Sequence, residues 1–280
     1  MRLVNSLEEK MNSTNLNKAP SCPTQCLVRA LPDNFANCLR EEPVEIDQAA
    51  ALAQHKNYTQ LIKKYVQNVS FVPPLPGQPD SVYIEDVAVI TGHHALVTRP
   101  GAPSRQAEIQ GIAEALGQFC TVHTTEAPAS IDGGDVMQVG NHLLVGLSKR
   151  TNHLGFKRLE EIALLDGITA HALDVKEGLH LKSAMTVIDH KTIIYDENVM
   201  KPVHIPGLKL NWVAAPEALG ANILAFEKVT IVSEDAPKTA ALLKSQGHHV
   251  ETVKVTELHK GDGALTCLSL RIAAPGCWAV

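Results

Sequence analysis

Three residues of this sequence carry the side chains that a cysteine hydrolase needs. Asp132, His180 and Cys267 follow one another along the chain in that order. They offer a carboxylate, a proton-transfer group and a thiolate nucleophile, and the carboxylate would orient the histidine and stabilise its imidazolium form. Spacing along the chain does not show that the three residues meet, because many proteins contain one residue of each type.

Cys267 lies in the stretch 263–272, GALTCLSLRI, which begins with a glycine and then contains no residue that breaks a strand. This pattern predicts a turn that runs into a buried strand, with Cys267 near the start of the strand. A thiol held there beside a flexible turn would be both rigid and reachable. The alternative is a packing residue, because free cysteine is among the most buried residue types.

Acidic residues occur in two places that favour a role in binding or catalysis. Asp80, Glu85 and Asp86 lie in an apolar run that we predict to be a strand, with Asp80 and Asp86 on the same face. An unpaired carboxylate is costly to bury in such a run. Two glycines separate Asp132 from Asp135 and predict a turn that presents carboxylates at the head of a strand. Solvated acids at strand ends and in an ordinary turn are the alternatives.

His180 lies in a run of apolar and basic residues, where a hydrogen-bonded core histidine is the common outcome. Arg99 and Arg150 each end a strand-like run, and ordinary surface arginines are the alternative there.

The elements that would position these residues alternate in a regular order. The order strand, strand, helix, strand recurs four or five times, with roughly 50 residues in each repeat, and predicts an α/β propeller-like or barrel-like ring. No glycine-rich phosphate loop occurs, so nucleotide binding has no support. We expect a flexible tail over 1–22 and a single domain over 23–280. Helices are predicted at 47–66, at 104–116 with Ser104 as its cap, after a Thr151 cap, and at 236–246; strands are predicted at 26–31, 82–90, 94–98, 119–123, 135–139, 142–145, 168–173, 184–188, 192–195, 229–232 and 249–253.

Composition limits the classes of partner. Of the 280 residues 45% are hydrophobic but only 4% are aromatic, so the core must consist mainly of Val, Ile, Leu and Ala. The net charge of −5 argues against a nucleic-acid binder, which needs a basic face. The N-terminus resembles no signal peptide and no apolar stretch is long enough to cross a membrane. We therefore expect a cytoplasmic protein whose six cysteines are mostly reduced, with neither a nucleic acid nor a membrane as partner.

Seven segments, which together span residues 27–272, resemble the dimethylarginine dimethylaminohydrolases, a family of the guanidine-modifying pentein superfamily. They occur in the order found in that family, and this order is more specific than any one segment. The resemblance implies a pentein α/β-propeller, a pseudo-fivefold ring of ββαβ units around a central channel, and no cofactor. The segments are 27–32 (LVRALP), 80–86 (DSVYIED), 98–105 (TRPGAPSR), 132–136 (DGGDV), 145–152 (VGLSKRTN), 179–183 (LHLKS) and 262–267 (DGALTC).

The resemblance implies hydrolysis of asymmetric dimethylarginine or monomethylarginine to citrulline and dimethylamine or methylamine, an activity tied to nitric oxide regulation. Cys267 would be the nucleophile that forms a covalent thiouronium intermediate. His180 would act as general acid and then as general base, and Asp132 would orient it. Because the substrate and a protonated His180 are both cationic, we expect the pKa of Cys267 to fall when substrate binds.

The resemblance also implies how the substrate is held. Carboxylates would line the pocket for the cationic end, and guanidinium groups would grip the α-carboxylate, whose geometry they match. A leucine would form part of a lid, and main chain would contact the α-amine. These residues are Asp80, Glu85 and Asp86 for the carboxylates, Arg99 and Arg150 for the guanidinium pair, Leu31 for the lid, and Gly261 for the main-chain contact.

Several alternatives and details stay open at this point. Relatives of the same fold include enzymes of the arginine deiminase type and amidinotransferases, and a non-catalytic pentein would instead bind a macromolecular partner. The chemistry needs no metal, although zinc bound at Cys267 would inhibit it. The substrate would be a small molecule, and the protein would be a monomer or a homodimer.

Overall fold

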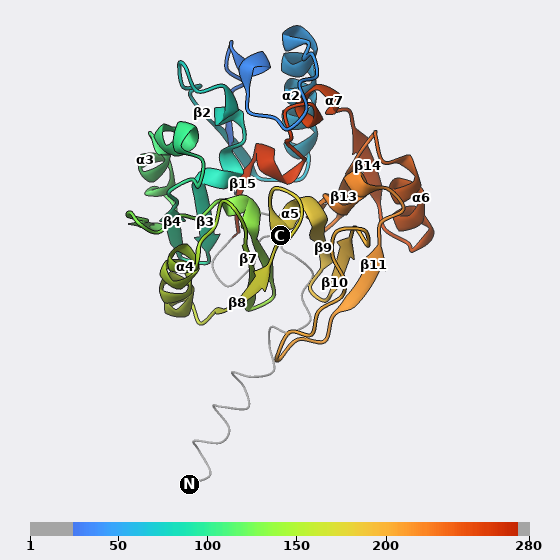
Figure 1. Ribbon diagram of the computed structural model, residues 1–280. Coiled ribbons are helices and arrows are strands. Elements are labelled where there is room, and N and C mark those ends of the chain that lie inside the picture. The colour runs from blue at the N-terminus through green and yellow to red at the C-terminus, as the bar shows by residue number, and fades with distance from the viewer. Residues whose placement is uncertain (1–24, 274–280) are drawn as a thin grey trace.

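Five small sheets lie around a common centre in the computed structural model, which describes residues 25–273 (Figure 1). Each sheet contains three strands, of which one outer strand is antiparallel and the other parallel to the middle one. This arrangement confirms the predicted pseudo-fivefold ring. The predicted tail at 1–22 lies outside the described residues.

The repeat is clear in the sheet nearest to His180. Strand β6 (Val136–Val139) pairs antiparallel with β7 (His142–Leu147), and β7 pairs parallel with β8 (Thr169–Asp174). Parallel neighbours require a crossover, which here is helix α4 (His153–Leu165). The sequence of elements is therefore ββαβ, as the order of the predicted elements indicated.

Three more sheets follow the same order of strands, and two of them include a crossover helix. Their elements are β3 (Ala88–Thr91), β4 (His94–Val97), α3 (Ile112–Leu116) and β5 (Thr121–Thr124); β9 (Met185–Asp189), β10 (Thr192–Tyr195) and β11 (Asn211–Ala214), joined by a connection at 196–210; and β12 (Leu224–Phe226), β13 (Val229–Ser233), α6 (Pro237–Ser245) and β14 (Val250–Val253).

The two ends of the described chain close the ring. Strand β15 (Leu270–Ile272) pairs antiparallel with β1 (Gln25–Arg29), and β1 pairs parallel with β2 (Asn68–Val72) after helix α2 (Gln48–Ile62). The turn that carries Cys267 leads directly into β15, so Cys267 is placed by the strand that completes the last sheet.

Several predicted elements differ from the observed ones near the chemistry. The predicted strand at 82–90 begins only at Ala88, because two short 3-10 helices, η2 (Pro79–Val82) and η3 (Ile84–Val87), precede it. Cys267 lies in a 3-10 turn, η7 (Thr266–Leu268), rather than in the strand itself. An apolar run of this length does not distinguish a strand from a tight helical turn by its pattern alone.

Two predicted caps were also wrong. Ser104 lies inside a 3-10 helix, η4 (Pro103–Ile109), rather than at a helix start. Helix α4 is capped by Asn152, whose side chain accepts a hydrogen bond from Gly155 N, whereas the hydroxyl of Thr151 donates to Asp135. The helix predicted at 47–66 is α2, and the side chain of Asp47 caps it by accepting from the backbone N–H groups of Ala49 and Ala50.

Separate apolar clusters lie beneath the sheets, and aliphatic residues dominate them, as the low aromatic content predicted. One cluster joins Leu159 and Ile162 of α4 to Leu96 of β4 and Leu143 and Val145 of β7. Among residues 25–273, no helix combines the length and apolar character that a membrane span requires.

Two leucines of α4 give a matched test of this packing. Leu159 is completely buried, whereas Leu164 is 72% exposed. We expect Leu159→Ala to lower the free energy of unfolding by about 2–5 kcal/mol, because it leaves a cavity in the cluster. Leu164→Ala should change it by less than about 0.5 kcal/mol. Urea denaturation followed by circular dichroism measures both, and equal losses would contradict the packing described.

Candidate active site

A cleft of about 330 Å³ brings together residues from distant parts of the chain. Such a volume suits a small molecule. Both acidic and basic side chains line it, so it fits a ligand that carries both charges. The lining includes Leu39, Asp80, Tyr83, Asp86, Arg105, Lys149, Arg150, His180, Gly261, Asp262 and Cys267.

Cys267 is partly buried in the η7 turn, where its backbone N–H donates to the carbonyl of Ala264 at 3.2 Å. Burial, reinforced by the negative charges of Glu85 and Asp86, raises the pKa of the thiol to about 12. The thiol is therefore protonated at neutral pH when the cleft holds no ligand.

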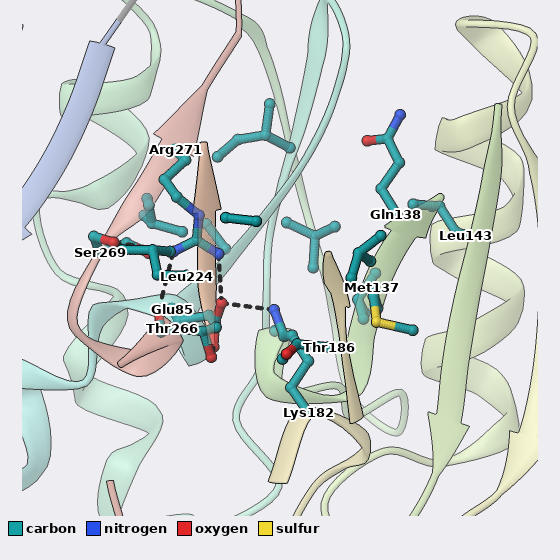
Figure 2. Close-up of a pocket in the computed structure, with 18 of the residues that line it drawn as sticks. Glu85, Met137, Gln138, Leu143, Lys182, Thr186, Leu224, Thr266, Ser269 and Arg271 are labelled. Atoms are coloured by element: carbon teal, nitrogen blue, oxygen red, sulfur yellow. Dashed lines mark hydrogen bonds and ion pairs between the residues drawn. The ribbon is translucent and has the colours of Figure 1, made fainter. Parts of the chain in front are cut away.

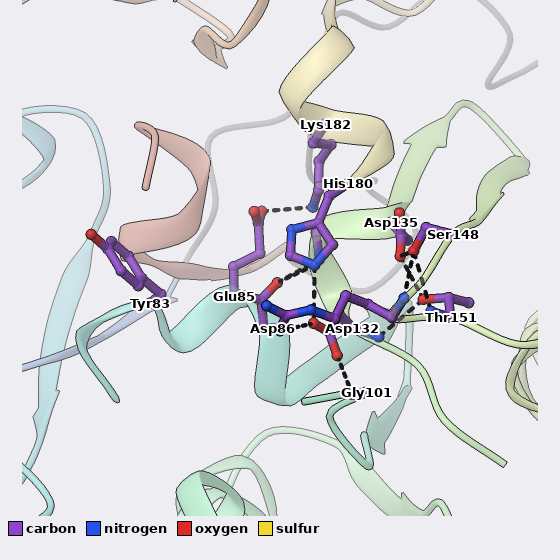
Figure 3. A network of polar contacts seen from close by, with 12 residues as sticks. Tyr83, Glu85, Asp86, Gly101, Asp132, Asp135, Ser148, Thr151, His180 and Lys182 are labelled. Atoms are coloured by element: carbon purple, nitrogen blue, oxygen red, sulfur yellow. Dashed lines mark hydrogen bonds and ion pairs between the residues drawn. The ribbon is translucent and has the colours of Figure 1, made fainter. Parts of the chain in front are cut away.

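His180 immediately precedes the short helix α5 (Leu181–Ala184), and its ring is almost fully buried. Its Nε2 lies 2.9 Å from Oδ2 of Asp132 and 4.0 Å from Oδ1 of Asp86 (Figure 3). Burial opposes the charged ring, but Asp86 and Asp132 outweigh it and raise the pKa of His180 to about 9. At neutral pH the ring is an imidazolium, the form that a general acid needs.

Asp132 is completely buried and is paired on both of its oxygens. Oδ1 accepts a hydrogen bond from the backbone N–H of Gly101 at 2.8 Å. Oδ2 accepts from His180 and, at 3.4 Å, from Nη1 of Arg150. These contacts fix the carboxylate in one orientation and fix the histidine ring through it.

Asp135 is a second buried carboxylate that holds the site together, although the sequence predicted only a turn for it. Its Oδ2 accepts hydrogen bonds from the hydroxyls of Ser148 and Thr151, both at 2.6 Å. Its Oδ1 accepts from the backbone N–H of Leu181 at 2.9 Å. Asp135 thereby holds the loop that contains Arg150 against the segment that contains His180 (Figure 3). The hydroxyl residues that flank Arg150 were the signal in the sequence.

Asp80 and Asp86 both line the cleft, as the motif at 80–86 predicted. Oδ2 of Asp86 accepts from Nη1 of Arg105 at 2.6 Å, and Oδ1 accepts from Gly134 N at 2.9 Å. Burial opposes ionisation, but His180 and Arg105 outweigh it and lower the pKa of Asp86 to about 2. Burial raises the pKa of Asp80, which accepts a hydrogen bond from the backbone of Leu39.

The structure separates the two predicted arginines. Arg150 lines the cleft, whereas Arg99 does not; Nη1 of Arg99 donates to the carbonyl of Ala129 at 3.5 Å. The arginine of this motif that does reach the cleft is Arg105, which sequence reasoning missed. Its guanidinium is buried and bonded to Asp86 and Glu108, so it mainly holds Asp86 in place.

The predicted lid residue, Leu31, also lies away from the cleft. It is 6% exposed and packs in the apolar cluster that contains Tyr58 and Ile62 of α2. The leucine that lines the cleft is Leu39, which is 43% exposed. Both leucines follow strand β1, Leu31 before and Leu39 after the turn at η1 (Phe35–Asn37). The sequence around them does not reveal which one lines the cleft.

Glu85 and Gly261 occupy different places. Glu85 does not line the cleft, and its carboxylate faces a second cavity inside the ring (Figure 2). Gly261 does line the cleft. A β-carbon at position 261 would lie 2.5 Å from Oη of Tyr83 and 2.7 Å from Sγ of Cys38, so the packing admits only glycine.

Within residues 25–273, one group of side chains lies close enough together to share a cation, namely Asp86, Asp132 and His180. Asp132 and His180 are already hydrogen-bonded to each other, and Asp86 is paired with Arg105. Cys267 is not part of this group.

The chain is similar to known enzymes over most of its length. The profile of the arginine deiminase family matches residues 39–209. N(G),N(G)-dimethylarginine dimethylaminohydrolase of Streptomyces coelicolor is 35% identical over 233 residues, which are 82% of this chain and 89% of that enzyme. The Pseudomonas aeruginosa enzyme of the same name is 29% identical over 87% of this chain and 95% of its own length.

The fold comparison agrees with the sequence comparison. A solved structure of the Pseudomonas aeruginosa enzyme, a cysteine-to-serine mutant complexed with citrulline, matches with a TM-score of 0.83. The match covers 89% of this chain and 99% of that chain at 29% identity. Similarity over nearly the whole length of these relatives, with the same ring of sheets, confirms the resemblance that the seven sequence segments indicated. The chain belongs to the dimethylarginine dimethylaminohydrolase family of the pentein superfamily.

Proposed function

We propose that this protein hydrolyses methylated arginine, releasing citrulline and dimethylamine from asymmetric dimethylarginine, or citrulline and methylamine from monomethylarginine. The observation that carries the proposal is the 2.9 Å hydrogen bond between His180 and Asp132 in the cleft that also contains Cys267 and Arg150. The names of the two relatives with high coverage support this choice of substrate.

The proposed reaction begins with a neutral thiol and a cationic histidine that line the same cleft. A substituted guanidinium is also a cation, and Asp80 and Asp86 line the cleft in which it would bind. Its positive charge offsets the carboxylates that keep the pKa of Cys267 high, so the thiol releases its proton to solvent. The thiolate then attacks the guanidinium carbon and forms a carbon–sulfur bond.

His180 would serve both halves of the reaction. Its imidazolium donates a proton to the departing dimethylamine as the carbon–nitrogen bond breaks, which leaves a thiouronium on Cys267. The neutral ring then takes a proton from water, and the resulting hydroxide attacks the thiouronium carbon. Collapse of this adduct breaks the carbon–sulfur bond, returns the thiolate and releases citrulline. Because Asp132 bonds Nε2, the other ring nitrogen, which points away from Asp132 in Figure 3, is the one that transfers protons.

Recognition of the amino-acid end would rest on Arg150 and Gly261. Arg150 is partly exposed in the cleft and keeps donors for a carboxylate, whereas the donors of Arg105 are mostly used by protein acceptors. The carbonyl of Gly261 would accept a hydrogen bond from the α-amine. Leu39 would cover the bound ligand, a role that the sequence had assigned to Leu31.

Three narrower expectations from the sequence stay predictions. The enzyme would work in the cytoplasm, as a monomer or a homodimer. Zinc would inhibit it by binding the thiol of Cys267, with His180 as a second ligand.

The direct test is citrulline release from asymmetric dimethylarginine and from unmodified arginine, measured side by side, with Cys267→Ser as the blank. We expect turnover of the methylated substrate and a loss of at least about 10³-fold in the variant, because serine is a far weaker nucleophile. Turnover of arginine alone would replace the proposal with an arginine deiminase. Amidine transfer to an added amine without citrulline would indicate a transferase, and no reaction at all would favour a ring that only binds a partner.

The second prediction concerns the α-carboxylate. Arg150→Ala should raise KM for the amino-acid substrate by about 10–100-fold, because it removes a charge-assisted contact. It should lower kcat/KM much less for a simple alkylguanidine, which has no carboxylate, because Asp132 keeps its hydrogen bonds from His180 and Gly101 when Arg150 is removed. Arg99→Ala is the matched control and should leave both values unchanged, since Arg99 lies outside the cleft. Equal losses for both substrates in Arg150→Ala would show that Arg150 does not bind the carboxylate.

The third prediction concerns the protonation state of Cys267. Neutral iodoacetamide should alkylate Cys267 slowly at pH 7, and the rate should still be rising at pH 10, because the pKa of the thiol is about 12. Cationic chloroacetamidine should react faster than neutral chloroacetamide at the same pH, since its charge stabilises the thiolate. Mass spectrometry of the Cys267 peptide measures both rates. A rate for iodoacetamide that levels off below pH 7 would mean that the free enzyme already holds a thiolate.

A further inference from the structure

Glu85 lies on the opposite side of the Cys267 turn from the cleft. Its carboxylate lines a small cavity of about 80 Å³ inside the ring, together with Lys182, Thr266 and Arg271 (Figure 2). Cys267 lines the cleft instead. The η7 turn therefore separates the two spaces, with Thr266 facing one and Cys267 facing the other.

The carboxylate of Glu85 is buried and has a charged or hydroxyl donor on each oxygen. Oε1 accepts from Nζ of Lys182 at 2.6 Å and from Nη2 of Arg271 at 3.0 Å. Oε2 accepts from Oγ1 of Thr266 at 2.8 Å. Both carboxylate oxygens are thus engaged by the protein.

Two of these donors, and Glu85 itself, lie close in the sequence to residues of the proposed catalytic mechanism. Thr266 directly precedes Cys267, and Lys182 follows His180 by two residues. Glu85 itself directly precedes Asp86. One carboxylate therefore joins the three segments that carry Asp86, His180 and Cys267.

Arg271 adds a second connection to the same turn. Its Nη1 donates to the carbonyls of Thr266 and Ser269, at 3.2 and 2.9 Å. The η7 turn is only three residues long and has little hydrogen bonding of its own. Its position is therefore set largely by Glu85, by Arg271 and by Asn222, whose Nδ2 lies 3.0 Å from Oγ1 of Thr266.

We infer that Glu85 is a positioning residue, which fixes the turn of Cys267 against the segment of His180 and does not contact the substrate. The inference rests on the proposed function, and it moves Glu85 from the pocket lining that the sequence resemblance implied to the support behind the nucleophile. A displacement of the sulfur by about 1 Å is enough to cost about 10²-fold in rate.

Thr266→Val tests this inference without unpairing a charge. Valine has nearly the shape of threonine but cannot donate to Glu85. We expect kcat for dimethylarginine to fall by about 10–100-fold and KM to change by less than about threefold, because only positioning is lost. Thr266→Ser, which restores the hydroxyl, should recover most of the lost kcat.

Thr186→Val is the matched control. Thr186 lines the same cavity and is buried, but its hydroxyl donates to Ala221 and does not touch Glu85. Its kcat should stay within about threefold of the wild type, although it loses two buried hydrogen bonds, one donated to Ala221 and one accepted from Ile223 N. An equal fall of kcat in Thr186→Val and Thr266→Val would reduce the effect to general loosening of the core and overturn the inference.

Glu85→Gln distinguishes support from substrate contact. We expect a fall in kcat with KM nearly unchanged. If Glu85→Gln raises KM by tenfold or more and keeps the wild-type kcat, Glu85 is a substrate contact instead. A Thr266→Val variant with wild-type kcat would likewise count against the positioning role. If Glu85→Gln does not fold, because Lys182 and Arg271 lose their buried partner, the Thr266 variants decide the matter alone.

Failure of the proposed function is separable from failure of this inference. If the wild type releases no citrulline, the rate of Cys267 alkylation by chloroacetamidine replaces kcat as the readout. The alkylation rate should differ from the wild-type rate in Thr266→Val and return toward it in Thr266→Ser. In Thr186→Val it should stay at the wild-type value. An unchanged rate in Thr266→Val would overturn the positioning role whatever the substrate is.

Discussion

The charges of four buried carboxylates, Glu85, Asp86, Asp132 and Asp135, constrain the whole site. A carboxylate that loses water must gain hydrogen bonds or a countercharge, and each of the four has done so within the protein. The partners they recruit are the imidazole of the site, three arginines, a lysine, hydroxyls and backbone N–H groups. The ring of sheets supplies these partners from segments that are far apart in the sequence.

The same charges determine the chemistry of the resting protein. Asp86, Asp132 and Asp135 raise the pKa of His180 to about 9, against the effect of burial. Burial, followed by the charges of Glu85 and Asp86, raises the pKa of Cys267 to about 12. The resting pair is a thiol and an imidazolium, which cannot attack an electrophile. A cationic guanidinium changes this balance by adding positive charge next to the carboxylates. In the proposed mechanism the charge of the substrate activates the thiol, whereas a neutral molecule in the cleft leaves the thiol largely protonated and slow to react.

The alternation of predicted elements indicated a ring of α/β units with four or five repeats, and the resemblance carried by the order of the motifs implied that the ring is fivefold. Local detail was harder. A short apolar run does not distinguish a strand from 3-10 turns, and the turns around Asp86 and Cys267 were therefore misassigned. Arg99 and Arg105 lie in one motif, and Leu31 and Leu39 follow one strand. Only the path of the folded chain shows which member of each pair faces the cleft.

The central claim is that Cys267 forms a covalent bond to the guanidinium carbon before water does. Rapid acid quench of the enzyme during turnover of dimethylarginine, followed by mass spectrometry of the peptide that contains Cys267, tests this most directly. The account predicts a transient mass increase on Cys267 that corresponds to the substrate less dimethylamine, and that decays as citrulline appears. The claim would be contradicted if citrulline forms, in a burst or at steady state, while Cys267 stays unmodified at every time point. The same result in a variant slowed at His180 would confirm that contradiction.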